Sequence, residues 1–348
     1  GCFFGPAEGK FDDYARAATE AGVDCEVLDV NEARNRFPMF RFPTAVGAVH
    51  DHTAGVIAAV RTMTALARLA EAAGASLMWD TRVLDVDVTA GPVRLTVQQR
   101  DRRIELQAER VLICPGPWAT RLLPFLASRL QVALQTVGYF VLSGSQSDFE
   151  VGHWPVWGNL GAPDGEIFYG LPAFGRKGIK IARHVTSGTA HDPDLIPEQV
   201  DPAEIDRLRE FLAREFVPSV ERLVGAEHCL YTNTSTEDYI VDLHPDNDRV
   251  AIAAGFSGHG FKLAPVCGRV LAELVTDELV AASELAKAGD KRYAAKLEEI
   301  RQLHLKSAKD LTGPEDQSRV AESVDVILTR LEELLQGVSL VKECTPRT

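Results

Sequence analysis

The chain has 348 residues, of which 45% are hydrophobic and 25% are charged, and its formal net charge is -13. This composition is ordinary for a globular protein, and the length allows two domains or one large α/β domain with an embedded sheet. The acidic balance argues against a nucleic-acid partner, because phosphate backbones require clustered lysine and arginine. No apolar run reaches the roughly 18 residues of a membrane-spanning helix, so we expect no such segment.

Six cysteines occur without a CxxC pair and without the His/Cys spacing of a zinc site, so we expect no metal. Reduced thiols in a cytoplasmic protein are the plainest interpretation. The first residues do not follow the pattern of a secretory signal, and the last residues are not a peroxisomal address. We therefore expect a cytoplasmic protein.

Apolar spacing in the first part of the chain predicts helices and strands in alternation. The predicted elements are a helix over 11–22, a strand over 25–30, a helical turn stopped by Pro38, a helix over 57–74, strands over 76–79 and 81–88, a hairpin from 93–98 to 104–107, and a strand over 110–114. The last of these is nearly continuously apolar, which is typical of a buried parallel sheet.

The middle of the chain, residues 132–195, is predicted to be rich in strand. A helix over 202–224, strands within 226–254 and a helix over 262–287 are predicted to follow, and then two amphipathic helices over 291–337 with a break at Gly313–Pro314. We expect these last helices to pack on their own chain, with self-association as the weaker alternative. Together the elements predict an α/β (α+β) fold, in which an α/β domain is interleaved with a mostly antiparallel sheet.

A glycine-rich segment from Val250 to Lys262 has the densest chemical signals. A strand of small residues enters a loop with Gly255, Gly258 and Gly260, and a helix follows. Such glycines allow backbone N–H groups to approach a planar or anionic ligand closely. On the glycines alone, a tight strand-to-helix connection in any α/β protein is an equally good interpretation.

The segment preceding this loop makes the pattern more specific. Cys-x-Tyr-Thr at 229–232, Asp-x-His-Pro at 242–245 and Gly-Phe-Ser-Gly-His-Gly-Phe-Lys at 255–262 resemble the family of monomeric sarcosine oxidase, pipecolate oxidase and N-methyltryptophan oxidase. These are FAD-dependent amine oxidases of the D-amino-acid oxidase superfamily. The resemblance covers roughly residues 1–275 and implies an FAD-dependent oxidoreductase fold.

The resemblance implies that FAD is the cofactor and that Cys229 forms a thioether to the flavin 8α carbon. From residue type alone, a buried cysteine that acts as a small hydrophobe is the commoner interpretation. Further flavin-binding residues are expected at Val83, Gly116, Trp118, Gly255, Phe256, Ser257, Gly258, His259 and Gly260. Asp242 and His244 are expected to fix the turn before Pro245.

The resemblance also assigns catalytic residues. Lys262 matches the lysine that pairs with the substrate carboxylate, and Tyr169 and Tyr231 match tyrosines of the same pocket. Lys180 matches the lysine that activates oxygen beside the flavin, and His184 matches a histidine near the substrate amine. On pattern alone, a solvated lysine, a core tyrosine and a structural histidine are the alternatives.

The reaction implied is oxidation of a secondary amino acid, such as sarcosine or pipecolate, to an imine while O2 is reduced to H2O2. The chain departs from the family because it lacks the Gly-x-Gly-x-x-Gly unit that cradles the FAD pyrophosphate. We expect a partial, Rossmann-like FAD domain in 1–130 and 226–287, a substrate domain in 131–225 and a helical extension in 288–348. Two alternatives stay open: a flavin-free remnant that serves as a binding protein, and a dehydrogenase with another electron acceptor.

Overall fold

The computed structural model describes residues 1–89, 91–161, 165–184, 191–276, 285–286, 288 and 290–311, together with residues 325, 329, 332 and 336. These residues form two compact units. The first unit consists of Gly1–Asp80, Leu123–Asp238 and Gly255–Gly258, and the second of Thr81–Leu122, Tyr239–Ala254 and the described part of His259–Thr348. Each unit is defined by the contacts within it and not by a bound ligand, so the predicted division into a flavin-binding and a substrate domain stays a prediction.

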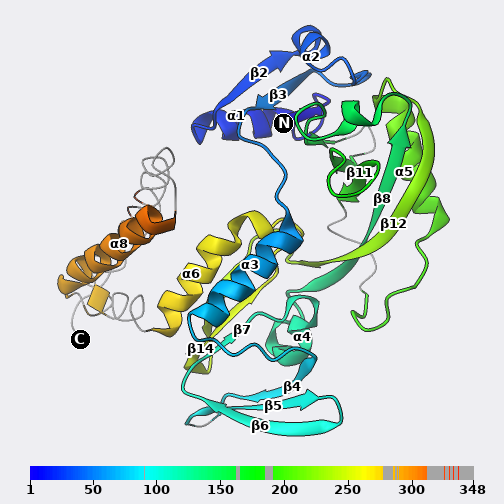
Figure 1. Ribbon diagram of the computed structural model, residues 1–348. Helices are drawn as coiled ribbons and strands as arrows, with labels where there is room; N and C mark the ends of the chain where they lie inside the picture. The colour runs from blue at the N-terminus through cyan, green and yellow to red at the C-terminus, as the bar shows by residue number, and fades with distance from the viewer. Residues whose placement is uncertain are drawn as a thin grey trace. The chain divides into compact units, whose positions relative to one another are not determined.

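An eight-stranded sheet forms the framework of the first unit (Figure 1). Its strands in spatial order are β12 (Val220–Asn233), β8 (Gln131–Leu142), β11 (Ile179–His184), β10 (Ile167–Leu171), β9 (Trp157–Asn159), β1 (Cys2–Gly5), β3 (Gly47–Asp51) and β2 (Cys25–Asp29). β1 and β9 run parallel, and every other neighbouring pair is antiparallel. The mostly antiparallel sheet predicted for the middle of the chain is thereby confirmed.

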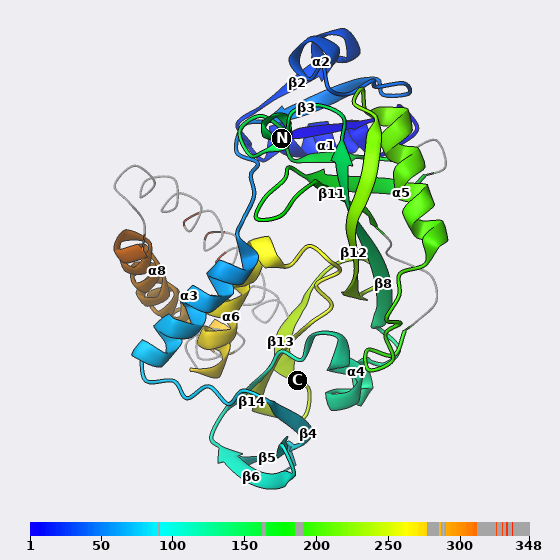
Figure 2. The ribbon, with the colours of Figure 1, turned by 45° about the vertical axis from the view of Figure 1, so that its right-hand side comes forward.

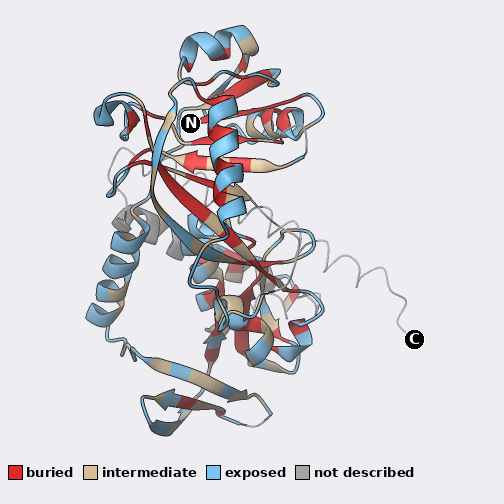
Figure 3. Ribbon diagram, turned by 90° about the vertical axis from the view of Figure 1, so that its right-hand side faces the viewer, coloured by how far each residue is buried: buried red, intermediate tan, exposed pale blue. Residues whose placement is uncertain are grey.

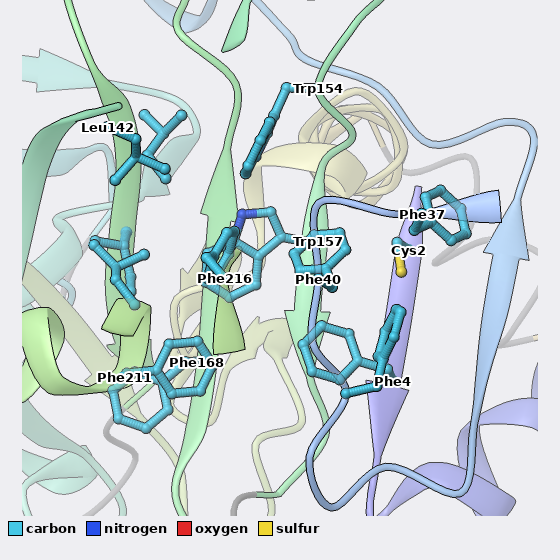
Figure 4. Packing of buried hydrophobic residues seen from close by; sticks show 14 of the residues in the cluster. Cys2, Phe4, Phe37, Phe40, Leu142, Trp154, Trp157, Phe168, Phe211 and Phe216 are labelled. Atoms are coloured by element: carbon cyan, nitrogen blue, oxygen red, sulfur yellow. The ribbon is translucent and has the colours of Figure 1, made fainter. Parts of the chain in front are cut away.

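One face of this sheet packs against helix α5 (Pro202–Glu215), which contacts β8, β11 and β12 (Figure 2). The apolar side of α5 supplies buried residues at helical spacing, among them Leu208 and Phe211. The ring of Phe211 stacks on Phe168 at a centroid distance of 4.1 Å and on Trp157 at 5.7 Å (Figure 4). Buried residues are accordingly concentrated in the strands of this sheet (Figure 3).

Helix α5 ends at Glu215, whereas the sequence predicted a helix to residue 224. Phe216 is extended and fully buried in the core, and Pro218 disfavours helical geometry in the residue before it. The side chain of Arg41 donates to the carbonyl oxygens of Phe216 and Val217, which satisfies backbone groups beyond the helix end. The next regular element is therefore the strand β12, which begins at Val220.

The other helices of the first unit are α1 (Phe11–Glu20), α2 (Val30–Arg36) and α3 (Ala59–Ala72). α2 begins with a capping box, in which Asp29 accepts from the backbone of Glu32 and the Glu32 carboxylate accepts from the backbone of Asp29. Residues 76–79, predicted as a strand, form no regular element. Asp80 has a φ of 52°, which belongs to a turn and not to an extended strand.

The described residues of the second unit form two three-stranded sheets. One is the predicted hairpin region, with β4 (Thr81–Asp87), β5 (Val93–Gln99) and β6 (Arg102–Ala108); the other has β13 (Ile240–His244), β14 (Asn247–Ala254) and β7 (Val111–Ile113). β7 pairs in parallel with β14, as its apolar sequence predicted. Helix α6 (Ala264–Val275) packs on this second sheet.

The described part of the second unit also contains the helices α4 (Ala119–Leu122) and α8 (Arg292–Leu311). Helix α6 ends at Val275 with Thr276 as its C-cap, whereas the sequence predicted a helix over 262–287. Residues 277–284 and 287, and the break predicted at Gly313–Pro314, lie outside the described residues. No helix within the described ranges is both long and apolar enough to cross a lipid bilayer.

Candidate active site

Five of the residues singled out in the sequence lie on one face of the eight-stranded sheet. On β11, Lys180 and His184 alternate with Ile179 and Ile181, which belong to the hydrophobic core shared with α5. The register between neighbouring strands places the other predicted residues on the same face as Lys180 and His184, because directly paired residues share a face. The pairs are Lys180 with Tyr139, Tyr169 with Ala182, Cys229 with Gln135, and Tyr231 with Ala133. The sheet therefore has a core face and a polar face.

Two tyrosines form a hydrogen-bonded pair on the polar face. The hydroxyl oxygens of Tyr169 and Tyr231 are 2.9 Å apart, and Tyr231 is almost fully buried. Burial raises the pKa of both phenols, so both hydroxyls are neutral at physiological pH. Since one hydroxyl donates to the other, one phenolic proton of the pair remains for another acceptor.

His184 has a carboxylate partner that the sequence did not suggest. Its Nε2 atom is 3.5 Å from an oxygen of Glu237, and its ring centroid is 5.5 Å from that of Tyr231. Glu237 has a φ of 65° in the turn after β12. β11 and β12 do not pair with each other, and both pair with β8. His184 and Glu237 therefore meet only through the register of both strands on β8, which no local sequence pattern predicts. Gln135, fully buried on the same face opposite Cys229, was missed for the same reason.

Cys229 is an exposed free thiol on β12, not the buried hydrophobe that residue type alone favours. Partial burial of the sulfur raises the pKa of Cys229, and the nearby positive charge of Lys180 opposes that rise. The thiol is therefore accessible from the polar face and lies within electrostatic range of an ammonium group.

The glycine loop packs against the end of β12. The backbone N–H of the buried Ser257 donates to the carbonyl of Thr232 at 3.0 Å, and the Ser257 hydroxyl accepts from the N–H of Thr234 at 3.3 Å. Gly258 has a φ of 79°, and a Cβ there would overlap the ring of Tyr231. Gly258 is therefore required by the protein's own packing, and the loop lies beside Tyr231, two residues from Cys229.

The other predicted site residues belong to the second unit. The Tyr239 hydroxyl lies 3.0 Å from the His259 carbonyl oxygen and 2.7 Å from His259 Nδ1. A single phenolic proton cannot serve both, so donation to the carbonyl requires Nδ1 to carry the proton and donate to Tyr239. Lys262 is exposed in a short 3-10 turn, and Gly260 precedes that turn.

Gly116, Trp118 and Val83 are also in the second unit. Gly116 follows β7 with a φ of 56° and no atom within 4 Å of its Cβ position; Trp118 is exposed and Val83 is half-buried in β4. The roles of these residues and of His259, Gly260 and Lys262 beside the polar face of the first unit stay predictions.

Residues 2–274 match the family described as FAD dependent oxidoreductase (DAO). The chain is 34% identical over 263 residues to monomeric sarcosine oxidase of Bacillus sp. (strain B-0618), and the aligned region covers 74% of this chain and 65% of that protein. It is 33% identical over 263 residues to peroxisomal sarcosine oxidase of Homo sapiens, with 72% and 64% covered. N-methyl-L-tryptophan oxidase of Escherichia coli O139:H28 (strain E24377A / ETEC) is 28% identical over 279 residues, with 79% and 71% covered.

Solved structures agree with the fold. Glycine oxidase from Geobacillus kaustophilus superimposes with a TM-score of 0.62 at 22% identity, over 79% of this chain and 70% of that one. NikD, an amino acid oxidase essential for nikkomycin biosynthesis, gives 0.61 at 22% identity, over 79% and 72%. The predicted fold class is thereby confirmed.

The chain spans about 65% of the length of the sarcosine oxidases that it matches. The family match nevertheless extends over most of the 348 residues and includes every predicted site residue. The chain therefore belongs to the family of FAD dependent oxidoreductases.

Proposed function

We propose that this chain supplies the substrate pocket and the flavin-ring side of an FAD-dependent oxidase of secondary amino acids such as sarcosine or pipecolate. The observation that carries the proposal is the single polar face that bears Tyr169, Lys180, His184, Cys229 and Tyr231. Relatives at 28–34% identity are named as oxidases of sarcosine and of N-methyl-L-tryptophan, both of which are N-methylated amino acids.

The residues present fit the flavin-ring end of FAD. Cys229 is an accessible thiol on the polar face and would hold the flavin through its sulfur. The glycine loop at 255–260, with Val83, Gly116 and Trp118, would complete the binding site. When bound, FAD would accept two electrons from the substrate and deliver them to oxygen to give hydrogen peroxide. The 348 residues contain no Gly-x-Gly-x-x-Gly motif, so the sequence offers no match for the residues that hold the pyrophosphate.

The chain's own groups would position the substrate. The neutral Tyr169–Tyr231 pair retains one phenolic proton, which it can donate to a substrate oxygen. Lys262 would pair with the substrate carboxylate, since an ammonium is a compact donor for an anion. His184, oriented by Glu237, would face the substrate amine. The charge of Lys180 would stabilise negative charge that develops on oxygen during its reduction.

The tether is tested by colour. The purified protein is incubated with FAD and precipitated with acid, and the visible absorption of the flavin is measured in the pellet. We expect acid-stable flavin in the wild type and in Cys114→Ser, a matched variant of another exposed thiol, and none in Cys229→Ser. Acid-stable flavin in Cys229→Ser contradicts the tether, and a wild type that binds no FAD at all supports the flavin-free alternative.

The electron acceptor is tested by comparing peroxide release with dye reduction. With sarcosine or pipecolate in air, an oxidase releases peroxide, whereas a dehydrogenase reduces an added dye and leaves oxygen untouched. We expect Lys180→Met to slow peroxide release by on the order of 100-fold, the loss typical of one electrostatic stabiliser. Lys177→Met, in the exposed turn before β11, should release peroxide at the wild-type rate. Equal rates in the two variants would contradict the role of Lys180.

Self-association through the C-terminal residues and a cytoplasmic location are parts of the sequence prediction that these experiments do not address. They stay predictions.

A further inference from the structure

Two histidines and two carboxylates share one face of the strand pair at the other end of the large sheet. β2 and β3 are antiparallel with Glu26 directly opposite His50. The pairing continues by one step, because the N–H of His52 donates to the carbonyl of Asp24 at 3.0 Å. Residues two apart on a strand share a face, so His50 and His52 stand beside each other opposite Glu26 and Asp24.

The side chains converge on a small volume. His50 Nδ1 lies 3.8 Å from one oxygen of Glu26, and His52 Nε2 lies 3.8 Å from the other. One ligand atom from each of the three residues lies within 4.8 Å of the others. A tetrahedral zinc ion, with bonds of about 2.0–2.2 Å, holds its ligand atoms roughly 3.4 Å apart. Small rotations of the exposed Glu26 and His52 side chains would close that difference.

A cation already occupies part of this position. The guanidinium of Arg36, the last residue of α2, has its Nη1 atom 3.0 Å from His50 Nδ1 and 3.2 Å from a Glu26 oxygen. The donor set thus attracts positive charge, and Arg36 stands in for the ion. The Arg36 side chain is 47% exposed, so it can swing away into solvent.

The backbone of the cluster is held in place. Asp51, between the two histidines, points to the other face, and its carboxylate accepts from the N–H groups of Thr53 and Ala54. The ring of His50 packs edge-on against Phe37 at a centroid distance of 5.1 Å. Since the strand end and one imidazole are fixed, binding a metal would order few additional groups.

We infer that Glu26, His50 and His52 form a binding site for a divalent transition metal, with Zn²⁺ as the best fit. Two imidazoles and one carboxylate are ligands that zinc accepts, whereas magnesium and calcium prefer oxygen atoms alone. A water would complete the coordination, and Asp24, 4.0 Å from His52 Nδ1, would accept the proton of that nitrogen and orient the ring. In sheet order β10, β9 and β1 separate this pair of strands from β11, so the metal would act apart from the polar face and would clamp β2 to β3.

The test is calorimetric titration of the tag-free full chain with ZnCl2, and with MgCl2 for comparison. We expect one equivalent of Zn²⁺ to bind and Mg²⁺ not to compete. Each of His52→Ala and Glu26→Gln should weaken zinc binding by at least about tenfold. Loss of a group that only hydrogen-bonds to a metal ligand already weakens binding by about that factor, and loss of a ligand should cost more. His191→Ala, a histidine outside the cluster, should bind as the wild type does.

Arg36→Ala provides the opposite test. Removal of the competing guanidinium should tighten zinc binding, by up to about fivefold because exposed ion pairs are weak. A gain in affinity cannot result from misfolding. Bound Co²⁺ should show visible bands without thiolate charge transfer, which separates this site from a cysteine. Zinc binding that persists in both His52→Ala and Glu26→Gln, or that does not exceed Mg²⁺ binding, overturns the proposal.

Discussion

Two helices of the first unit have the same length and opposite surroundings. α5 and α3 both contain 14 residues and both have apolar residues at helical spacing. α5 buries Ile205, Leu208, Phe211, Leu212 and Glu215 against the sheet. α3 buries none, and Val60, Met63, Leu66 and Leu69 are 81%, 55%, 49% and 63% exposed. Periodicity thus specifies a helix and its apolar side, whereas the energy gained depends on what covers that side.

The largest expected difference between the two helices concerns their apolar side chains. Phe211→Ala should reduce the free energy of unfolding by about 3–5 kcal/mol, because it removes a ring stacked on Phe168 and leaves a cavity. Leu66→Ala on α3 should change it by less than about 0.5 kcal/mol. Urea unfolding followed by circular dichroism measures both. A loss at Leu66 comparable with that at Phe211 would mean that α3 is covered in solution.

The next effect concerns the ion pair that joins α5 to the sheet. Arg183 on β11 donates to both oxygens of Glu204 on α5, at 2.9 and 3.0 Å, and to Glu166 at 2.9 Å. Removal of the guanidinium of Arg183 leaves the partly buried carboxylates of Glu166 and Glu204 without its positive charge. Arg183→Met should therefore reduce the free energy of unfolding by about 1–3 kcal/mol. Arg61→Met on the exposed α3 is the matched control, with an expected change below about 0.5 kcal/mol.

A double-mutant cycle sharpens the test of this ion pair. If the coupling is direct, Glu204→Gln combined with Arg183→Met should be less destabilising than the sum of the two single changes. Strict additivity would show that Arg183 and Glu204 are not coupled, so that the loss in Arg183→Met comes from Glu166 or from packing.

The same contrast explains what could be predicted from sequence. The strand-rich middle of the chain, which includes Lys180 and His184, was predicted because the alternation of apolar and polar residues is a local signal. The partner Glu237 was not predictable, since it depends on register across β8. The end of α5 was misplaced because burial of Phe216 outweighed a continuing helical pattern. The cluster at His50 and His52 was missed because Glu26 reaches it only through strand pairing.

Helix capping gives a smaller effect. The Asp201 side chain accepts from the N–H of Ala203 at the start of α5, whereas Ala58 at the start of α3 has no side-chain cap. Asp201→Ala should cost about 1 kcal/mol of unfolding free energy. Ala58→Asp should instead protect the first amides of α3, which hydrogen exchange measures, and should leave global unfolding unchanged. Destabilisation of the whole unit by Ala58→Asp would show that the α3 terminus already makes other contacts.

The smallest effect is a pH dependence at the last residue of α5. Burial raises the pKa of Glu215 above its ordinary 4.5, and the hydrogen bond from Arg214 only partly opposes this. A raised folded-state pKa means that the folded chain binds this proton more tightly than the unfolded chain does. The resulting stabilisation is fully present below about pH 4.5 and is lost as the pH rises through the raised value.

Glu215→Gln removes this titration. Gln keeps the shape of the side chain and removes its negative charge. That charge is unfavourable both in a buried place and at a helix C-terminus. The variant should therefore gain stability over the wild type at neutral pH, and the gain should shrink as the pH falls toward 4.5. Urea midpoints at a series of pH values measure it. A variant that is less stable than the wild type at neutral pH would show that the ion pair with Arg214 outweighs the burial of the carboxylate.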